Sequence, residues 1–189
     1  MIAHIEELCD ISVFSFVFQV KDLSKRSKEM DGQELTRLAE LYSGLVFRVA
    51  YCYVKNCADA DDIMQDVFLA LYTYKKDFRD DEHIRAWLIR VTSNRCKNLL
   101  SSYRYRMSMP LEMAENIPAS EQKHDDLLPV IMKLDQKYRI VLYMYYYEEY
   151  SVNDIAEALG IKQTAVTTRL SRGRKLLKEL LIKEGYHGL

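Results

Sequence analysis

Apolar residues recur every three or four positions along most of this chain, which is the spacing of one face of an α-helix. The pattern begins near Gln33 and returns after each short polar break. Only 6 glycines and 3 prolines occur among the 189 residues, so few residues would interrupt the helices. The sequence contains no glycine-rich phosphate loop, which argues against binding of a nucleotide cofactor. We therefore predict an all-α protein.

The first part of the chain predicts three helices. The first starts at Gln33, and a break at 56–58 separates it from a second helix that Asp59 would cap. A polar turn at 77–83 precedes the third helix. Because each helix has one apolar face, we expect the three to pack into one compact domain over residues 30–106. The predicted apolar positions are Leu35, Leu38, Tyr42, Leu45, Val49 and Tyr53, then Ile63, Val67, Leu71 and Tyr74, then Ile84, Leu88, Val91 and Leu99.

Two segments lack this periodicity. Residues 1–29 contain an aromatic and β-branched stretch followed by a basic run. We interpret them as an N-terminal extension, and we favour a mis-assigned start codon, with Met30 as the true start, over a real appendage. Residues 107–126 hold two of the three prolines and are net acidic, so we predict a flexible linker there. The expected architecture is two small helical domains joined by that linker.

The second domain, residues 127–189, contains a predicted helix-turn-helix. One or two helices with a bend near Asp135 come first. Ser151 and Asp154 then form a capping-box pattern, and Gly160 stops the short helix that follows. The second helix of such a motif can enter the major groove of DNA. This helix would bury Val166, Leu170 and Leu177.

The formal net charge is −1, but the charged residues are unevenly distributed. Residues 85–106 contain six basic residues and no acidic one, and residues 160–189 contain seven basic residues and two acidic ones. Each basic segment is a candidate surface for nucleic-acid phosphates. On the C-terminal helix, some basic side chains suit phosphates. Beside them, short polar side chains and one further arginine suit base edges. The candidate phosphate ligands are Arg169, Arg174 and Lys175, and the candidate base readers are Thr167, Thr168, Ser171 and Arg172.

The placement of cysteines and histidines predicts no metal site. The four cysteines form no C-x-x-C pair, and no histidine stands at a zinc-ligand spacing from them. The best apolar stretch, 11–20, is half the length of a membrane-spanning helix of ~20 residues, and acidic rather than basic residues precede it. We therefore predict a cytoplasmic protein with free thiols, no cofactor, no small-molecule substrate and no membrane insertion.

The acidic segment 59–66 is predicted to be a docking face and not a metal or catalytic site. Asp59, Asp62 and Asp66 share one helix face, but no histidine or cysteine joins them, and their spacing is not that of a calcium loop. Acidic residues are favoured at a helix start by capping and the helix dipole alone. A basic protein partner is therefore expected, and no catalytic residue is predicted.

Three motifs follow one another in the chain. Residues 59–68 read DADDIMQDVF, Phe78 precedes the run IRAWL at 84–88 and Asn94, and residues 151–174 begin SVNDIA and end TRLSRGR. They are similar to D-A-E-D-[LIV]-x-Q-[ED]-[VT]-F, to F…R-x-W-L…N and to S-x-x-E-I-A…[ST]-R-L-x-R-[AG]-R. In this order the motifs resemble those of the bacterial ECF (extracytoplasmic function) sigma factors of the sigma-70 family, and the resemblance covers residues 35–181.

The resemblance implies a non-catalytic initiation subunit of RNA polymerase. Its partners would be core RNA polymerase, promoter DNA and an anti-sigma factor. Residues 30–106 would be sigma region 2, which binds the polymerase clamp and opens the −10 element, and residues 127–189 would be region 4, which binds the −35 element. The implied polymerase contacts are Asp61, Asp62, Gln65 and Asp66; the implied −10 contacts are Phe78, Arg79, Asp80, Trp87, Arg90, Asn94 and Lys97; the implied −35 contacts are Thr167, Thr168, Arg169, Ser171, Arg172 and Arg174.

Two other classes of protein stay open at this point. One is a stand-alone helix-turn-helix regulator whose N-terminal helices sense a ligand or dimerise, and the other is a nucleic-acid enzyme that uses the aspartate cluster. Co-purification with core polymerase would separate a sigma factor from a stand-alone regulator, and metal-dependent nuclease activity would support the enzyme. The tyrosine-rich run 143–147 has no predicted role beyond packing.

The chain also departs from the family pattern at several positions. Asp135 stands where the family usually has proline, and Thr164 and Ala165 stand where it has Gly-Thr. Asn98 and Ser101 replace a common aspartate and arginine on the predicted −10 helix. These differences bear on local DNA contacts and on how the recognition helix starts.

Overall fold

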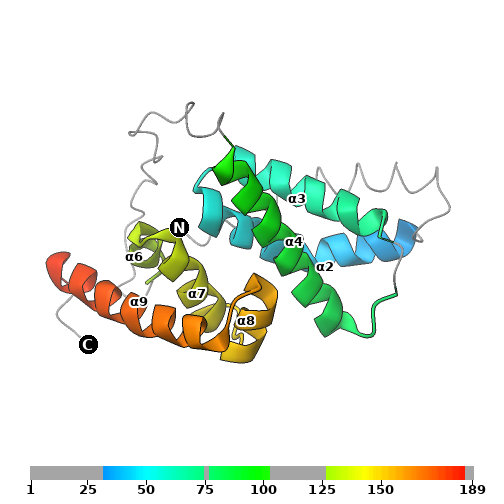
Figure 1. Cartoon of the computed structure of the whole chain (residues 1–189). Helices are drawn as coiled ribbons and strands as arrows, with labels where there is room; N and C mark the ends of the chain where they lie inside the picture. The colour runs from blue at the N-terminus through cyan, green and yellow to red at the C-terminus, as the bar shows by residue number, and fades with distance from the viewer. Residues whose placement is uncertain (1–31, 75–76, 103–126, 186–189) are drawn as a thin grey trace. The chain divides into compact units, whose positions relative to one another are not determined.

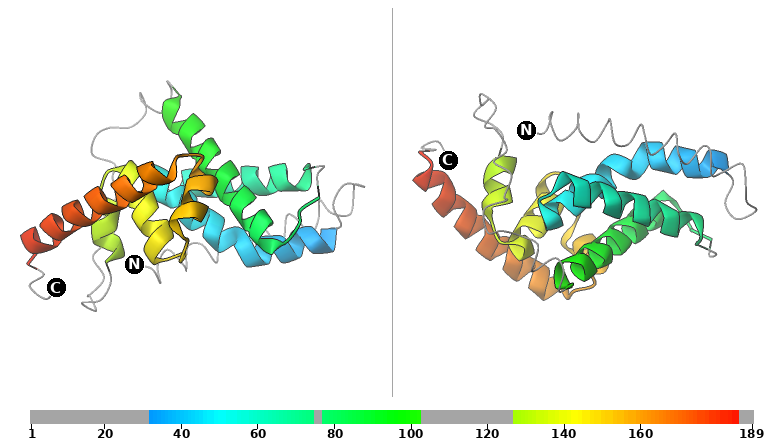
Figure 2. Two further views of the ribbon diagram at one scale, coloured as in Figure 1. Left: turned by 60° about the horizontal axis from the view of Figure 1, so that its bottom comes forward. Right: turned by 90° about the horizontal axis from the view of Figure 1, so that it is seen from above.

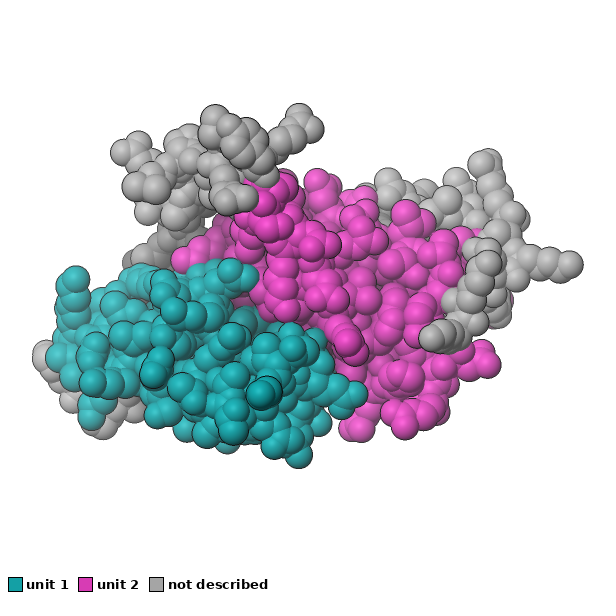
Figure 3. All heavy atoms as spheres, viewed as in Figure 1, with its two compact units in different colours: residues 1, 118–189 teal, residues 2–117 magenta. Residues whose placement is uncertain are grey.

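The computed structural model describes residues 32–74, 77–102 and 127–185 (Figures 1 and 2). Within these ranges the chain forms seven α-helices and no strand, so the all-α prediction is confirmed. The chain divides into two compact units, residues 2–117 and residues 118–189 with residue 1 (Figure 3). The predicted extension over 1–29 and the predicted linker over 107–126 lie outside the described residues.

The first unit is built from three helices, α2 (Gly32–Val54), α3 (Cys57–Tyr72) and α4 (Asp81–Ser101). α2 packs against both of the others, and α3 also contacts α4. Each helix turns its apolar stripe toward the other two, and full burial of a large apolar side chain contributes about 1.5–3 kcal/mol. The core of this unit includes Leu38, Val46, Phe47, Met64, Phe68, Leu71, Leu88 and Ile89.

The starts of α3 and α4 correct two predictions. α3 is capped by Asn56 and not by Asp59: Asn56 has an extended backbone, and its Oδ1 accepts a 3.0 Å hydrogen bond from the Asp59 amide. α4 begins at Asp81, inside the turn predicted over 77–83, because the Asp80 carboxylate accepts a 2.7 Å hydrogen bond from the amide of His83. Both caps satisfy amides that a helix start leaves without a partner.

The buried side of α4 also differs from the prediction. Thr92, Ser93 and Cys96 are buried there, while Val91 and Leu99 are only half-buried. Thr92 tolerates burial because its Oγ1 donates a 2.7 Å hydrogen bond to the carbonyl oxygen of Leu88. Hydrophobic spacing alone therefore placed Ile84 and Leu88 correctly in the core but misplaced the core-facing side of the second half of this helix.

The second unit contains α6 (Leu128–Lys133), α7 (Gln136–Tyr146), α8 (Val152–Leu159) and α9 (Gln163–Lys183). α9 packs against the other three helices. Asp135 is the N-cap residue between α6 and α7, which confirms the bend predicted there. The core of the unit includes Ile131, Ile140, Leu142, Met144, Ile155, Val166 and Leu170.

α8, a short turn and α9 form the predicted helix-turn-helix. Ser151 and Asp154 make a complete capping box: Ser151 Oγ accepts from the Asp154 amide at 3.3 Å, and Asp154 Oδ2 accepts from the Ser151 amide at 3.1 Å. Gly160 ends α8 with a φ of +64°, a left-handed conformation that side-chain-bearing residues rarely adopt. Ile161, in the turn after Gly160, is half-buried.

Two residues fix how α7 packs in this unit. A β-carbon added at Gly173 would lie 3.0 Å from Leu142 Cδ1, so α9 approaches α7 closely at that point. Arg139 of α7 is 3% exposed, and its Nη1 donates to the carbonyl oxygens of Met132 at 3.2 Å and Leu134 at 2.9 Å. Arg139 thereby satisfies carbonyl groups where α6 ends.

Burial is expected to keep the thiol of Cys96 unreactive. Cys96 is buried and Cys57 is half-buried. Burial raises the pKa of the Cys96 thiol to about 12, so the thiol stays protonated, and therefore non-nucleophilic, at neutral pH. We expect iodoacetamide to label Cys57 of the native chain well before Cys96, as measured by peptide mass mapping. Equal labelling rates in the native chain would contradict the burial of Cys96.

Candidate nucleic-acid and polymerase interfaces

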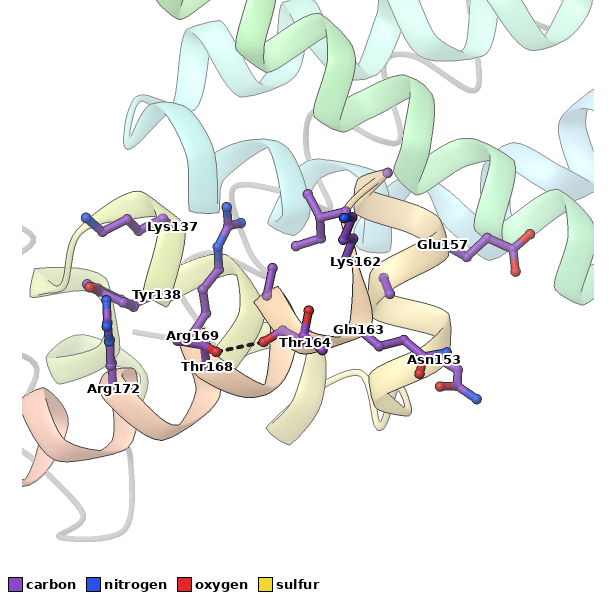
Figure 4. Close-up of a pocket in the computed structure, with 14 residues that line it drawn as sticks. Lys137, Tyr138, Asn153, Glu157, Lys162, Gln163, Thr164, Thr168, Arg169 and Arg172 are labelled. Carbon is purple, nitrogen blue, oxygen red and sulfur yellow. Dashed lines mark hydrogen bonds between the residues drawn. The ribbon is translucent and has the colours of Figure 1, made fainter.

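A groove of about 1240 Å³ lies beside the helix-turn-helix (Figure 4). Its walls come from the start of α7, from α8, from the turn and from the first turns of α9. Glu157 is the acidic residue among those that line it, whereas four lining residues are basic. A concave surface with this excess of positive charge suits a polyanion. The basic residues are Lys137, Lys162, Arg169 and Arg172.

The outward side of α9 carries the predicted base readers. Thr167, Thr168, Ser171 and Arg172 are all exposed, and Arg169 is half-buried, as the sequence predicted for this side. Thr167 Oγ1 donates to the Gln163 carbonyl oxygen at 3.0 Å, and Thr168 Oγ1 donates to the Thr164 carbonyl oxygen at 2.7 Å. With the hydroxyl protons used inside the helix, both threonines present an acceptor oxygen and a methyl group outward.

The angular positions on α9 separate the arginines. Each residue turns about 100° around the axis, so Arg172 and Arg174 stand on opposite sides of the helix. Arg172 lines the groove, whereas Arg174 contacts α7: its Nε donates a 2.8 Å hydrogen bond to Tyr146 Oη. The predicted −35 set is therefore not one patch, and the contact between Arg174 and Tyr146 was not predicted from the sequence.

A stripe of polar and aromatic side chains runs along α4 on the side away from the core. Trp87 is half-buried, and Arg90, Asn94 and Lys97 are exposed. At about 100° per residue these four positions fall within roughly a quarter of the helix circumference. The structure therefore gathers four of the predicted −10 residues on one face of α4.

The loop before α4 is held by a cluster of aromatic rings. The Phe78 ring lies 5.0 Å from the Tyr74 ring and 5.7 Å from the Trp87 ring, measured between centroids, and His83 packs edge-on to Phe78 at 5.4 Å. Of the other predicted −10 residues, Arg79 is exposed, and Asp80 is engaged as the cap of α4. Phe78 and Trp87 thus form part of the loop's own packing.

α3 presents an acidic face with an apolar residue in it. Asp62 and Asp66 are exposed, and Leu69 is 55% exposed on the same side of the helix, three residues after Asp66. Asp61 is half-buried and accepts a 2.9 Å hydrogen bond from Gln65 Nε2. Burial raises the pKa of Asp61, and the hydrogen bond from Gln65 opposes that shift.

An ion pair connects this acidic face to α4. Arg95 Nη1 lies 3.3 Å from Asp66 Oδ2, and both side chains are about half exposed. An exposed pair of this kind contributes ~0–1 kcal/mol. Asp66 can therefore exchange Arg95 for another cation at little cost in stability.

In the described segments 32–74, 77–102 and 127–185, no three histidine, cysteine, aspartate or glutamate side chains are arranged to hold a metal ion. None of the helices that the structure describes is both long and apolar enough to cross a bilayer.

One unit is a helix-turn-helix with a basic groove. The other is a three-helix unit with a basic aromatic stripe and an acidic face. Together these features define a DNA-binding transcription protein. Residues 38–106 match the family model of Sigma-70 region 2, and residues 124–177 match that of Sigma-70, region 4.

Curated relatives agree with these matches. The chain is 24% identical over 180 residues to the ECF RNA polymerase sigma factor SigW of Bacillus subtilis, covering 86% of this chain and 96% of SigW. It is 28% identical over 141 residues to the RNA polymerase sigma factor SigV of the same organism, covering 73% of this chain and 85% of SigV. The chain therefore belongs to the sigma-70 family and is an ECF sigma factor.

Solved structures support the fold. The sigma factor RpoE of Bartonella quintana, solved with the anti-sigma factor NepR, matches with a TM-score of 0.62 at 19% identity over 79% of this chain and 98% of RpoE. CnrH, solved with the cytosolic domain of CnrY, matches with a TM-score of 0.58 at 22% identity over 92% of this chain and 99% of CnrH.

The family assignment settles the class of function. As an ECF sigma factor, the chain binds core RNA polymerase and promoter DNA and directs promoter-specific transcription initiation. Sigma factors are initiation factors that recognise DNA and are not enzymes. This decides between the sigma factor and the stand-alone regulator that the sequence had left open.

Proposed function

We propose that the unit containing α6–α9 binds the −35 promoter element as double-stranded DNA, with α9 in the major groove. The observation that carries this proposal is the basic groove beside the exposed side of α9. The major groove is wide enough to admit a helix, and phosphates on its edge would meet Lys137, Lys162 and Arg169. Of these, Lys137 comes from outside the helix-turn-helix and was not predicted from the sequence.

Base reading in this proposal falls to the residues on the outward side of α9. Thr167 and Thr168 would accept hydrogen bonds from base amino groups or contact a thymine methyl, because their own protons are bonded within the helix. Ser171 and Arg172 continue the same exposed surface. Arg172 provides a guanidinium that can bond to both acceptors of a guanine.

Substituting Arg172 by alanine tests this assignment. We expect the variant to lose ~1–3 kcal/mol of discrimination at one −35 base pair, while polymerase binding stays unchanged. The measurement is competition binding of the holoenzyme to promoter fragments that differ at single −35 positions. Arg172→Lys is the matched control, because it keeps the charge but not the planar fork, and it should also lose discrimination. Unchanged preference in both variants would remove Arg172 from the base readers.

We infer that the unit containing α2–α4 opens and binds the −10 element. The stripe on α4 supports this, because aromatic rings with adjacent cations and amides suit unpaired bases and their phosphates. Arg90, Asn94 and Lys97 would hold the backbone, and Phe78 with Arg79 would lie at the point where a base leaves the stack. Asp80 would support this loop by capping α4, and Trp87 by packing against Phe78.

We further propose that the acidic face of α3 docks on a basic surface of core RNA polymerase. Asp62 and Asp66 supply exposed negative charge, and Leu69 supplies an exposed apolar contact one turn after Asp66. Gln65 holds Asp61 at the edge of the face by a hydrogen bond. An exposed apolar residue beside like charges is typical of interfaces in which electrostatics select the partner.

The solved relatives suggest a further partner. RpoE of Bartonella quintana was solved with an anti-sigma factor. We propose that this chain is also held by an anti-sigma protein, that it has no catalytic activity of its own, and that it acts in the cytoplasm together with RNA polymerase. Co-purification from cells with a tagged chain would identify such a protein.

A further inference from the structure

Arg174 of α9 contacts Tyr145 and Tyr146 at the tyrosine-rich end of α7. Neither base reading nor phosphate binding in the groove explains this contact. The Arg174 guanidinium lies over two rings, with Cζ 5.2 Å from the centre of the Tyr145 ring and 5.6 Å from that of Tyr146. Arg174 Nε also donates a 2.8 Å hydrogen bond to Tyr146 Oη, and the two tyrosine rings meet edge to face at 5.2 Å. Arg174 is exposed and Tyr146 is 50% exposed, so this cluster lies on the surface.

The partners of Arg174 leave its charge in place. A carboxylate would neutralise the guanidinium, whereas a neutral phenol and two aromatic faces orient it without cancelling its charge. The hydrogen bond uses Nε, and the described residues offer Arg174 no acidic partner within ion-pair distance. The two terminal nitrogens, which form the fork that matches a phosphate, are thus available for an anion.

The position of Arg174 on α9 indicates which anion it would meet. At about 100° per residue, Thr168 and Ser171 lie in the middle of the outward side, with Arg172 on one flank and Arg174 on the other. A helix in the major groove has a phosphate backbone on each side of it. The groove with Lys137, Lys162 and Arg169 would face one backbone, and Arg174 would then face the other.

We propose that Tyr146 is a positioning residue that holds Arg174 toward a phosphate of the DNA strand opposite the one bound by the groove. The inference rests on the proposed −35 binding by α9. Tyr146 limits the conformations of the Arg174 side chain before DNA binds, so Arg174 loses less conformational entropy on binding. Tyr145 provides the second ring of the same support.

The test measures how DNA binding by the holoenzyme depends on salt. Neutralising one phosphate contributes about 0.9 to the slope of log K against log salt, so the slope counts contacts. The probe is a promoter duplex recovered from a randomised pool by the wild-type holoenzyme. The variants are Arg174→Ala, Tyr146→Phe, which removes only the hydroxyl, and the double variant. Tyr147→Phe is the matched control, because the Tyr147 ring stacks on Tyr143 and not on Arg174.

We expect Arg174→Ala to lower the slope by about 0.9 and affinity by roughly tenfold. Tyr146→Phe should lower the affinity about threefold and should also give a salt slope smaller than that of the wild type. A hydroxyl with a merely structural role would leave the salt slope unchanged. The double variant should bind no more weakly than Arg174→Ala, and Tyr147→Phe should bind as the wild type does.

Two results would overturn the proposal. A wild-type slope in Arg174→Ala would show that Arg174 does not contact a phosphate, and a wild-type slope and affinity in Tyr146→Phe would show that Tyr146 does not position it. Failure of the underlying −35 assignment is distinguishable, because the wild-type holoenzyme would then bind duplexes with altered −35 elements equally well.

Discussion

A chain in which Asp62 and Asp66 are both replaced by lysine is expected to bind core RNA polymerase about 100-fold more weakly than the wild type. Both carboxylates are exposed on one side of α3, and each reversal would place a positive charge against a basic partner surface. Juxtaposed like charges at an interface cost several kcal/mol in total, and every 1.4 kcal/mol is tenfold in affinity. The measurement is equilibrium binding of the full chain to purified core polymerase.

The variant should still fold. Its main internal loss is the ion pair between Asp66 and Arg95, which is worth ~0–1 kcal/mol. Glu40→Lys combined with Glu82→Lys is the matched control, because it makes the same change in net charge at exposed sites on α2 and α4. Wild-type affinity in the folded Asp62 and Asp66 variant, or an equal loss in the control, would show that the α3 face is not the specific dock.

Replacing Arg139 by methionine is expected to destabilise the unit containing α6–α9 by about 3 kcal/mol. The substitution keeps most of the buried volume but removes the donor that bonds to the carbonyl oxygens of Met132 and Leu134. For a domain of this size, about 3 kcal/mol corresponds to a fall in melting temperature of more than ~10 °C. Lys137→Met on the same helix should change stability little, because Lys137 is exposed.

The single tryptophan makes this prediction specific to one unit. Trp87 is the only tryptophan in the sequence and belongs to α4, so its fluorescence reports on the unit containing α2–α4. In Arg139→Met, circular dichroism should show loss of helix at a lower temperature than in the wild type. The thermal transition of Trp87 fluorescence should keep its wild-type temperature. Unfolding of both signals at the wild-type temperature would show that Arg139 does not stabilise α6 and α7.

Features with strong local signals were predictable from the sequence. The capping box of Ser151 and Asp154 and the left-handed Gly160 depend on residues within one or two turns of each other, so their spacing identified the helix-turn-helix and its bounds. The outward side of α9 followed from the buried positions Val166, Leu170 and Leu177 in the same way. The family motifs then added a function to a fold that the periodicity already indicated.

Features that depend on tertiary contacts were not predictable. Thr92, Ser93 and Cys96 resemble a polar side in the sequence, yet they are buried, and Thr92 tolerates burial because its hydroxyl bonds to its own helix. Burial of Arg139 needs the end of α6 to lie beside α7. Such arrangements leave no periodic trace in the sequence.

The candidate site shows the same division. Exposure of Thr167, Thr168, Ser171 and Arg172 followed from helical spacing. The contact between Arg174 and Tyr146, which are 28 residues apart, and the contribution of Lys137 to the groove require the packing of α9 on α7. Leu69 was missed for a different reason, since a leucine in a helical repeat is ordinarily assigned to the core.

Run-off transcription with purified core RNA polymerase and a pool of promoter fragments tests the central claim most directly. We predict that the full chain added to core polymerase yields transcripts from a small set of fragments that share both a −35 and a −10 element, with no such selection by core polymerase alone. Substitution of either element should abolish those transcripts. A chain that binds core polymerase but selects no fragment above the level of core polymerase alone would contradict the account.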